Sequence, residues 1–373
     1  MDAVRQAPSQ GLVTVAWETT RSCPLRCLHC RADAVTRRHP DELTLAEGIR
    51  LIHEVAEAGA KVLVITGGDP LARPDVFDLI AEAASCGLHV GFSPSATPRL
   101  NMRALDKAVQ AGASTIHLSL DGASSGVHDA FRGVPGSFDR TLAGFGAVAG
   151  LGARLQVGTT VCRQTVGELP AIASLLTGIA DVWTLFFLVA TGRARADDEI
   201  TPSEQERVLH WLADGHHPYQ LRTVEAPEFR RILSEHGEQR VAGSGVGDGR
   251  GFCFVSHVGD VCPSGFLQIP VGNVRDKPLG YHYENAPLMR ALRDQASFGG
   301  RCGVCPWWPT CGGSRARAWA SSGDPLAEDP GCGYEPPAWA MAAPPATTGR
   351  EIDLDMTPGV ANGGTALASP VRT

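Results

Sequence analysis

Cys23-Pro-Leu-Arg-Cys27-Leu-His-Cys30 places three cysteines close together, in the spacing C-x3-C-x2-C. Thiolates with this spacing suit three irons of a [4Fe–4S] cluster, which normally takes four cysteine ligands. A local set of three is therefore either incomplete or open, with one iron left to a small-molecule chelate. A zinc site is the alternative interpretation, because His29 or His39 would supply a fourth ligand.

The cysteine segment follows the first of six short apolar segments that we expect to form strands. They are Leu12–Thr19, Lys61–Thr66, Leu88–Ser93, Ser114–Leu120, Arg154–Val161 and Val182–Val189. Amphipathic segments between them predict helices, among them Leu45–Ala58, Pro74–Cys86 and Gly167–Gly178, with Pro74 at the first helical position. Six strand–helix units predict parallel strands with right-handed crossovers, in a doubly wound sheet or a barrel.

Polar, Gly-rich or Cys-bearing segments follow all six expected strands. They are Cys23–Cys30, Gly67–Pro70, Ser93–Ser95, Ser119–Gly122, Cys162–Arg163 and Thr191–Arg193. In barrels the chemistry lies at the C-terminal ends of the strands, so we expect one shared active face. No G-x-G-x-x-G follows the first strand, which weighs against a dinucleotide-binding fold.

Composition narrows the class of protein. The chain has 373 residues, a hydrophobic fraction of 43% and a net charge of -7, so no basic footprint indicates nucleic acid or an anionic membrane. It lacks an apolar run long enough for a membrane span, and no signal peptide is recognisable. Eleven cysteines without a secretion signal indicate metal or redox use in a cytoplasmic protein.

The triad Cys23, Cys27 and Cys30 resembles the signature of the radical S-adenosylmethionine superfamily. In that family the open iron is chelated by the amino and carboxylate groups of S-adenosylmethionine. One electron from the cluster splits the sulfonium and releases a 5′-deoxyadenosyl radical, which abstracts hydrogen from a substrate. The resemblance implies a partial (β/α)6 barrel over residues 12–242, after a short lead of residues 1–11.

Three further segments resemble cofactor-binding motifs of the family. Gly67-Gly68-Asp69-Pro70 resembles its G-G-E-P motif, with Asp69 where glutamate is usual, so backbone contacts to the methionine amino group are favoured over a side-chain contact. Ser119-Leu-Asp121-Gly122 resembles a segment near the ribose and methionine. His29 stands where the family usually has an aromatic residue near the adenine.

Strand ends supply three more candidates. Arg193 is expected to pair with a carboxylate of cofactor or substrate, and Arg163 is a weaker candidate of the same kind. Cys162 would return a hydrogen atom to a substrate radical if the protein were an epimerase, although such a cysteine is more often a small buried hydrophobe. Cys86 lies on a helical pattern and is expected in the core.

A second cysteine set lies near the C-terminus, in the order Cys302, Cys305, Cys311 and Cys332. Four ligands indicate a closed site, either a zinc ribbon or an iron–sulfur cluster. Together with the first triad, the segment resembles the C-terminal SPASM module, which carries auxiliary [4Fe–4S] clusters. We therefore expect such a module over residues 243–334, with a Gly-rich linker at its start, and a disordered tail over residues 335–373.

A second auxiliary cluster is doubtful on the same resemblance. Cys253 and Cys262 match upstream ligands of that cluster, but Ser314 and Arg315 stand where many relatives have a further cysteine. A ligand such as His257 or Asp260 would have to complete the set. The resemblance thus implies at least one auxiliary cluster, held by the Cys302–Cys332 set, and a second one only if such a ligand joins Cys253 and Cys262.

The resulting prediction is a radical enzyme of cofactor, tetrapyrrole or peptide natural-product biosynthesis, served by a flavodoxin- or ferredoxin-type electron donor. The C-terminal half resembles peptide maturases of the pyrroloquinoline quinone and mycofactocin type and enzymes acting on haem d1 and haem b precursors. Few residues precede the first strand, so a peptide substrate would need a separate binding partner. The alternatives are a sugar or aminoglycoside epimerase or dehydrogenase, and a non-catalytic electron carrier or zinc-binding module.

Overall fold

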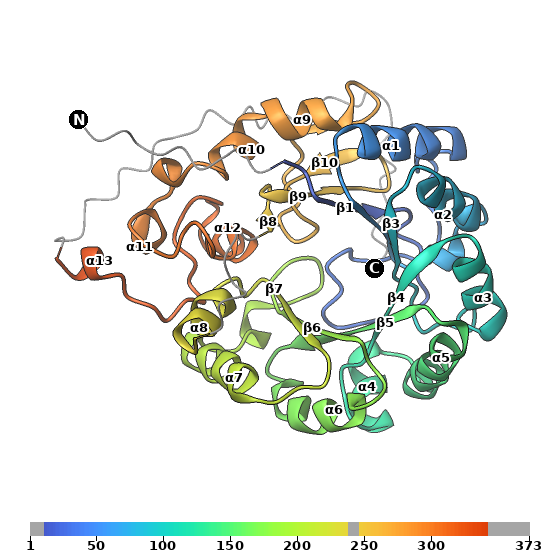
Figure 1. The fold of residues 1–373 in the computed structure, drawn as a ribbon, viewed down its shortest axis with the longest axis horizontal. Coiled ribbons are helices and arrows are strands. Elements are labelled where there is room, and N and C mark those ends of the chain that lie inside the picture. Colours follow the sequence, from blue (N-terminus) through green and yellow to red (C-terminus); the bar gives the residue numbers. More distant parts are fainter. Residues whose placement is uncertain (1–10, 238–245, 342–373) are drawn as a thin grey trace, which may run out of the picture.

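A parallel sheet with helices around its outer side forms most of the molecule (Figure 1). The computed structural model describes residues 11–237 and 246–341. Its first seven strands are β1 (Thr14–Glu18), β2 (Val62–Thr66), β3 (His89–Phe92), β4 (Ala113–Ser119), β5 (Arg154–Val161), β6 (Val182–Phe187) and β7 (Gln220–Val224). Neighbouring strands pair in chain order and in parallel, without a reversal of order. This order confirms the barrel and excludes a doubly wound sheet.

Eight helices follow the strands of this sheet: the fourth lies at the C-terminal ends of the strands against residues 26–28, and the other seven cover the outer side. They are α1 (Leu45–Glu57), α2 (Val76–Ser85), α3 (Met102–Gln110), α4 (Ser125–Arg132), α5 (Ser137–Leu151), α6 (Leu169–Leu176), α7 (Pro202–Asp214) and α8 (Phe229–Glu235). Short 3-10 turns lie at Pro70–Ala72, Val166–Glu168, Ala196–Asp198 and Gln295–Ser297. No helix among the described residues is long and apolar enough to cross a membrane.

Helix α1 shows how local sequence sets an element. Thr44 caps its N-terminus: the Thr44 hydroxyl accepts from the Glu47 N–H, and the Glu47 carboxylate accepts from the Thr44 N–H. Ile52 and Val55 are buried, whereas Leu45 in the first turn is 36% exposed. The expectation that Pro74 starts α2 was wrong, because that helix begins at Val76 with Asp75 at the N-cap.

The C-terminal segment extends the same sheet beyond β1. Its elements are β8 (Gly247–Asp248), β9 (Gly251–Val255), β10 (Asp260–Cys262), β11 (Gly272–Asn273), α9 (Leu279–Asn285), α10 (Pro287–Ala291), α11 (Gly300–Gly303), α12 (Arg315–Ser322) and α13 (Pro337–Met341). Strand β9 pairs in parallel with β1, and β10 and β11 follow antiparallel. One sheet therefore runs across the expected boundary between residues 242 and 243.

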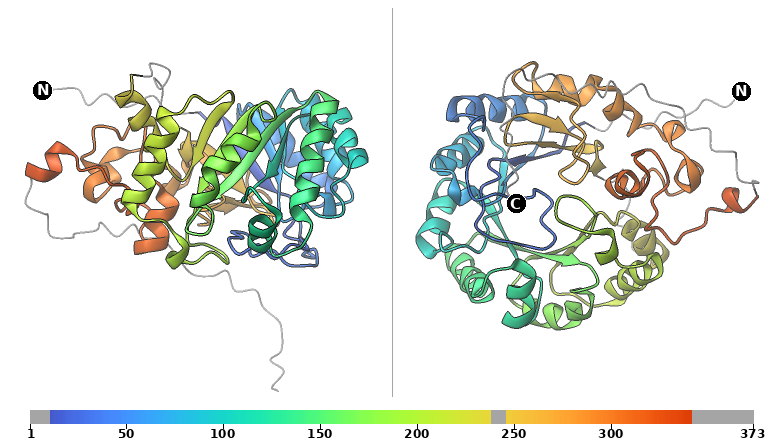
Figure 2. Two further views of the ribbon diagram at one scale, coloured as in Figure 1. Left: turned by 90° about the horizontal axis from the view of Figure 1, so that it is seen from below. Right: turned by 180° about the vertical axis from the view of Figure 1, so that it is seen from behind.

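Helices α11 and α12 occupy the open side of the barrel, between α8 and the β8–β9 edge, whereas α9 lies beside α1 (Figure 1; Figure 2, right). A second buried cluster, which includes Val189, Leu267, Leu292 and Trp308, lies beneath them. The expected linker falls partly on residues 243–245, and the expected disordered tail mostly on residues 342–373. Both of these stretches lie outside the described residues.

Candidate cluster and cofactor site

The first cysteine triad lies in a loop that follows β1 at the C-terminal ends of the strands. Cys23, Cys27 and Cys30 all line one cavity of about 210 Å³. Backbone bonds fix the loop from two sides, because Leu28 N–H donates to Phe131 O (3.1 Å) and Arg193 N–H donates to Cys30 O (3.0 Å). Segments after β4 and β6 therefore hold the loop that the first strand delivers.

The separation of the thiols can be compared with what a single zinc ion requires. Tetrahedral zinc with Zn–S bonds of about 2.3 Å brings its sulfur ligands to about 3.8 Å from one another. Within residues 11–237 and 246–341, the one group of three His, Cys, Asp or Glu ligand atoms mutually within 4.8 Å is His53, Glu82 and Cys86. Neither cysteine set meets this limit, so a single zinc ion would need the thiols to move closer together.

Burial makes Cys23 and Cys27 depend on a metal for their ionisation. Burial raises the pKa of the Cys23 thiol to about 11 and also raises the pKa of Cys27, which the nearby Arg132 only partly offsets. Free thiols of this kind stay protonated near neutral pH, whereas metal ligands are thiolates. The three cysteines thus fit a group that brings its own positive charge.

The Gly67-Gly68-Asp69 segment reaches the cavity through its glycines. Gly67 and Gly68 line the cavity, and a Cβ on Gly68 would lie 2.7 Å from Arg21 O, so the glycine permits close passage beside the cysteine loop. The Asp69 side chain is fully buried and accepts hydrogen bonds from Thr97 Oγ1 (2.8 Å) and Leu71 N–H (3.2 Å). The Asp69 side chain therefore stabilises the turn, and the cavity is lined by Gly67 and Gly68.

Ser119 and Asp121 likewise differ in whether they reach the cavity. Ser119 lines the cavity, while Asp121 is fully buried beneath it. The Asp121 carboxylate accepts from Arg132 Nε (2.6 Å) and from Thr160 N–H (2.7 Å). Burial opposes its charge, but Arg132, the nearby histidines and the Thr160 N–H together outweigh burial and lower the pKa of Asp121. Asp121 therefore orients Arg132, which lies in the cavity wall 3.9 Å from Cys27 Sγ.

Two histidines present unpartnered nitrogens at the cavity. His29 stacks on Phe131 with ring centroids 4.3 Å apart, and its Nδ1 is buried without a partner. His117 lines the wall from β4, and its Nε2 is likewise unpartnered. Burial, with a further contribution from Arg132, lowers the pKa of His29 to about 3 and that of His117 to about 4. Both rings are neutral and have hydrogen-bonding capacity left for a ligand.

The remaining strand-end candidates differ in position. Arg193 lines the cavity, donates to Cys27 O (3.0 Å) and Ala34 O (3.1 Å), and keeps Nη2 unpartnered. Arg163 is exposed and does not line the cavity. Cys162 is fully buried against Phe131 and Leu188, away from the cavity wall, so the structure does not support a hydrogen-donor role for it.

Sequence reasoning missed Arg132 and His117. Arg132 ends a helix, where a basic residue looks like ordinary capping chemistry. His117 lies two residues before Ser119 on β4 and shares its face, because side chains alternate along a strand. That period of two is the signal that could have found it.

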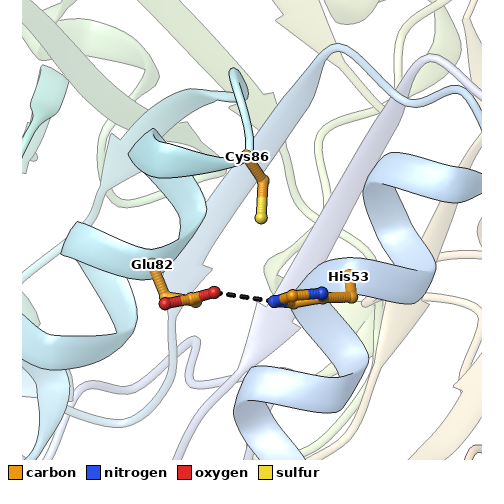
Figure 3. Close-up of side chains that lie close together, drawn as sticks. All are labelled: His53, Glu82 and Cys86. Atoms are coloured by element: carbon orange, nitrogen blue, oxygen red, sulfur yellow. Dashed lines mark hydrogen bonds and ion pairs between the residues drawn. The ribbon is translucent and has the colours of Figure 1, made fainter.

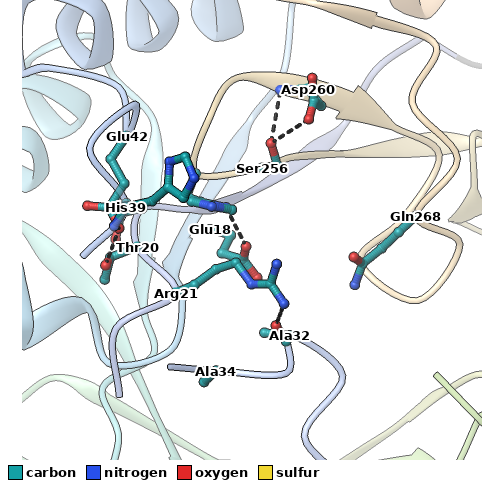
Figure 4. A network of polar contacts seen from close by, with 12 residues as sticks. Glu18, Thr20, Arg21, Ala32, Ala34, His39, Glu42, Ser256, Asp260 and Gln268 are labelled. Carbon is teal, nitrogen blue, oxygen red and sulfur yellow. Dashed lines mark hydrogen bonds and ion pairs between the residues drawn. The ribbon is translucent and has the colours of Figure 1, made fainter. Parts of the chain in front are cut away.

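A polar network joins the cysteine loop to the β9–β10 turn (Figure 4). Buried Glu18 accepts from Arg31 Nη1 (3.1 Å) and lies 3.1 Å from His257 Nδ1. Asp260 pairs with Ser256 and with Asn273 Nδ2 (2.9 Å). His257 and Asp260 thus already have partners within the protein.

Cys253 and Cys262 lie on opposite faces of the sheet. Cys262 is opposite Phe254, whose ring lies under the Arg31 guanidinium at the cavity wall. Cys253 precedes Phe254 on β9 and packs in the main hydrophobic core. Burial raises the pKa of both thiols strongly. In this arrangement the two cysteines do not share one cluster, which is contrary to their expected role as joint metal ligands.

The second cysteine set is brought together by the fold. Cys302, Cys305, Cys311 and Cys332 all line a small separate cavity of about 30 Å³. Hydrogen bonds reach the sulfurs: Gly313 N–H donates to Cys311 Sγ (3.3 Å), and Arg315 Nη2 donates to Cys302 Sγ (3.4 Å). Donors of this kind accompany iron–sulfur clusters and set their potentials.

Comparison with known proteins places the chain in a family. The family model described as "Radical SAM superfamily" matches residues 17–176 of this chain. The chain is 38% identical over 338 residues to the AdoMet-dependent heme synthase of Methanosarcina barkeri, covering 86% of this chain and 96% of that protein. This chain therefore belongs to the radical SAM superfamily and is an enzyme of that class.

Other relatives indicate the range of the group. The pre-heme d1 synthase of Dinoroseobacter shibae is 29% identical, over 91% of this chain and 89% of that protein. The mycofactocin maturase MftC of Mycobacterium ulcerans is 31% identical, over 88% and 90%. Streptococcus suis SuiB bound to its precursor peptide SuiA superposes with a TM-score of 0.69 at 15% identity, covering 86% of this chain and 75% of SuiB. The last likeness concerns the fold.

Membership defines the cofactors as a [4Fe–4S] cluster and S-adenosylmethionine. When bound, they supply a 5′-deoxyadenosyl radical that removes a hydrogen atom from substrate. The relatives favour this reading over an epimerase or a non-catalytic carrier.

Proposed function

We propose that this protein acts on a propionate-bearing tetrapyrrole and takes part in haem formation. The observation that carries the proposal is the similarity to the Methanosarcina barkeri heme synthase, which extends over 96% of that enzyme. The cavity wall is consistent with such a substrate. It combines the apolar residues Phe186, Leu188 and Phe266 with the guanidinium groups of Arg31 and Arg193.

The proposed reaction converts a propionate side chain to a vinyl group. The propionate β-carbon loses one hydrogen atom to the 5′-deoxyadenosyl radical, giving 5′-deoxyadenosine and a substrate radical. Cleavage of the carboxylate bond releases CO2, and removal of one electron completes the vinyl double bond. The net change is an oxidation, so the substrate radical needs an electron acceptor.

We propose the following roles for the cavity residues. Cys23, Cys27 and Cys30 hold the first cluster, and the backbone at Gly67 and Gly68 receives the methionine amino group. The lining side chains of His29, Ser119 and Arg193 contact the rest of the cofactor. Asp69 and Asp121 act through Thr97 and Arg132 as positioning residues, and Cys162 has no catalytic role.

The second cysteine set is the proposed site of one auxiliary cluster. Cys302, Cys305, Cys311 and Cys332 would hold it, and bound there it would supply the electron acceptor. A second auxiliary cluster is not part of the proposal, because Cys253 and Cys262 face opposite ways. We assign the barrel to residues 12–242 and the SPASM-like module to residues 243–334.

We further propose that a flavodoxin- or ferredoxin-type protein reduces the first cluster. We place the enzyme in the cytoplasm, because all eleven cysteines are free, as a reducing compartment would keep them.

Anaerobically reconstituted protein tests the function with Fe-coproporphyrin III, S-adenosylmethionine and a reductant. We expect 5′-deoxyadenosine together with a tetrapyrrole that has lost CO2 and two hydrogens per propionate. The Cys27→Ala variant should give neither. The Cys311→Ala variant should still release 5′-deoxyadenosine but lose the decarboxylated product and part of the iron.

Two outcomes would count against the proposal. Release of 5′-deoxyadenosine without any change in the tetrapyrrole would rule out the proposed substrate but not the radical chemistry. Modification of a precursor peptide, and not of the tetrapyrrole, would favour a peptide maturase function. The 31% identity with MftC points to that alternative.

A further inference from the structure

A histidine, a carboxylate and a thiol meet on the outer helical layer, away from both cysteine cavities. His53 lies on α1, Glu82 lies on α2, and Cys86 is the C-cap of α2 (Figure 3). Their ligand atoms, one from each side chain, all lie within 4.8 Å of one another. None of the three lines the cavities described above.

The local sequence explains why the three side chains converge. Glu82 and Cys86 are four residues apart, a spacing that places both on one face of α2. Helix α1 packs beside α2 and presents His53 to that face, where His53 Nε2 lies 2.7 Å from Glu82 Oε1. Figure 3 shows the Cys86 sulfur above this pair, on the same side.

We propose that His53, Glu82 and Cys86 form a peripheral Zn²⁺ site that ties α1 to α2. An imidazole, a carboxylate and a thiolate are three of the ligands that zinc takes in proteins, and water supplies a fourth. Magnesium and calcium prefer sets made only of oxygens, so the thiol and imidazole select against them. Binding replaces the thiol proton of Cys86 with a Zn–S bond and releases that proton.

The distances allow the site to form with small movements. Zinc bonds of about 2.0–2.1 Å to nitrogen and oxygen place those two ligands about 3.4 Å apart. The His53–Glu82 contact of 2.7 Å would open by less than an ångström, and Cys86 would approach from within 4.8 Å. The His53 and Glu82 side chains are 52% and 31% exposed, so both have freedom to adjust and the ion has a path of entry.

Zinc binding to the anaerobic holoenzyme, with its clusters in place, tests the site. Dialysis against buffered free Zn²⁺ should give one zinc per chain with no loss of iron. Zinc X-ray absorption should show a single sulfur neighbour. The Cys86→Ser variant should lose that sulfur and bind zinc at least tenfold more weakly, and His53→Ala should weaken it similarly.

His210→Ala is the matched control. His210 Nε2 lies 3.7 Å from Glu206 Oε1 on α7, at comparable exposure. This variant should bind zinc as the unaltered protein does. All three variants should keep the visible absorbance of the clusters, which reports that they fold.

Three results would overturn the site. They are no zinc uptake by the holoenzyme, uptake that is unchanged in Cys86→Ser and His53→Ala, and uptake only in exchange for iron, which would place the zinc at the cluster cysteines.

Discussion

Gly192 gives the sharpest test of how the barrel holds the cysteine loop. Its φ is +61°, and a Cβ there would lie 2.3 Å from Cys30 O and 2.5 Å from Arg31 O. Both obstructing atoms are backbone, so no side chain can swing aside. Restoring a 3.0 Å separation from Cys30 O would move the loop or the β6 segment by about 0.7 Å. The Gly192→Ala substitution therefore displaces the loop that carries the first cluster.

The magnitude follows from two contributions. A left-handed backbone costs alanine about 1–2 kcal/mol relative to glycine. Overpacking against a fixed neighbour costs a further 1–3 kcal/mol or so. Gly178 isolates the first contribution, because its φ is +75° and no atom lies within 4 Å of its added Cβ. The excess of Gly192→Ala over Gly178→Ala is thus about 1–3 kcal/mol, or about 5- to 150-fold in an equilibrium constant.

The assay is release of 5′-deoxyadenosine by anaerobic holoenzyme, together with iron content. Gly178→Ala should keep both near the values of the unaltered protein and lose only stability. Gly192→Ala should release 5′-deoxyadenosine at least fivefold more slowly and hold less iron. Equal rates in the two variants, within a factor of two, would refute the argument that this close approach positions the loop.

Three further predictions concern side chains around the cavity. Cys162→Ser should leave product formation per 5′-deoxyadenosine released unchanged, since Cys162 is buried off the cavity wall; a large loss of product with 5′-deoxyadenosine release retained would restore the hydrogen-donor hypothesis. Asp121→Ala should lower the free energy of unfolding by about 3 kcal/mol in anaerobic denaturation, because it leaves the Arg132 charge buried without its partner; a loss below 1 kcal/mol or so would contradict this. Burial and Arg132 lower the pKa of His117 to about 4 in the folded protein, whereas histidine in the unfolded chain has a pKa of about 6.5. As the pH drops, the unfolded chain is therefore protonated at His117 before the folded protein is, and the free energy of unfolding should fall from about pH 6.5 towards pH 4. Thermal midpoints of His117→Asn should depend less on pH across that window than those of the unaltered protein.

The six strand–helix units were predictable because each strand has a recognisable pattern in its own local sequence. Segment 154–161 was predicted with the bounds of β5, since alternating β-branched residues lie between Gly152 and a polar turn. Strand β7 was missed because its residues, Gln220–Val224, are only partly buried and carry no apolar run. Its place comes from pairing with β6, which is tertiary information.

Strand β9 was missed for a related reason. It pairs with β1 from the far end of the chain, and the Gly-rich residues before it read as a linker. The pairing also sets which way Cys253 and Cys262 face, so their separation could not be read from spacing. A motif in sequence gives the position of a residue along a strand, whereas its neighbours decide the direction of its side chain.

The two aspartates of the cofactor motifs show that distinction most clearly. Sequence placed Asp69 and Asp121 at strand ends beside the cavity, and the structure agrees about their location. Each carboxylate nevertheless turns away from the cavity, to Thr97 and to Arg132, because these partners come from later elements of the barrel. A fully buried carboxylate without such a partner would be costly, so each is fixed where it lies.

Both cysteine sets have an arginine guanidinium beside one of their sulfurs. Arg132 lies 3.9 Å from Cys27 Sγ and pairs with Asp121, which comes from the end of β4. Arg315 Nη2 lies 3.4 Å from Cys302 Sγ, and the buried Asp248 accepts from the Arg315 backbone N–H. Arg132 is the last residue of α4 and Arg315 is the first residue of α12, so in both sets the end of a helix places the guanidinium beside a thiol. A guanidinium at this position places a positive charge and a hydrogen-bond donor beside a sulfur ligand, and both act on the reduction potential of an iron–sulfur cluster.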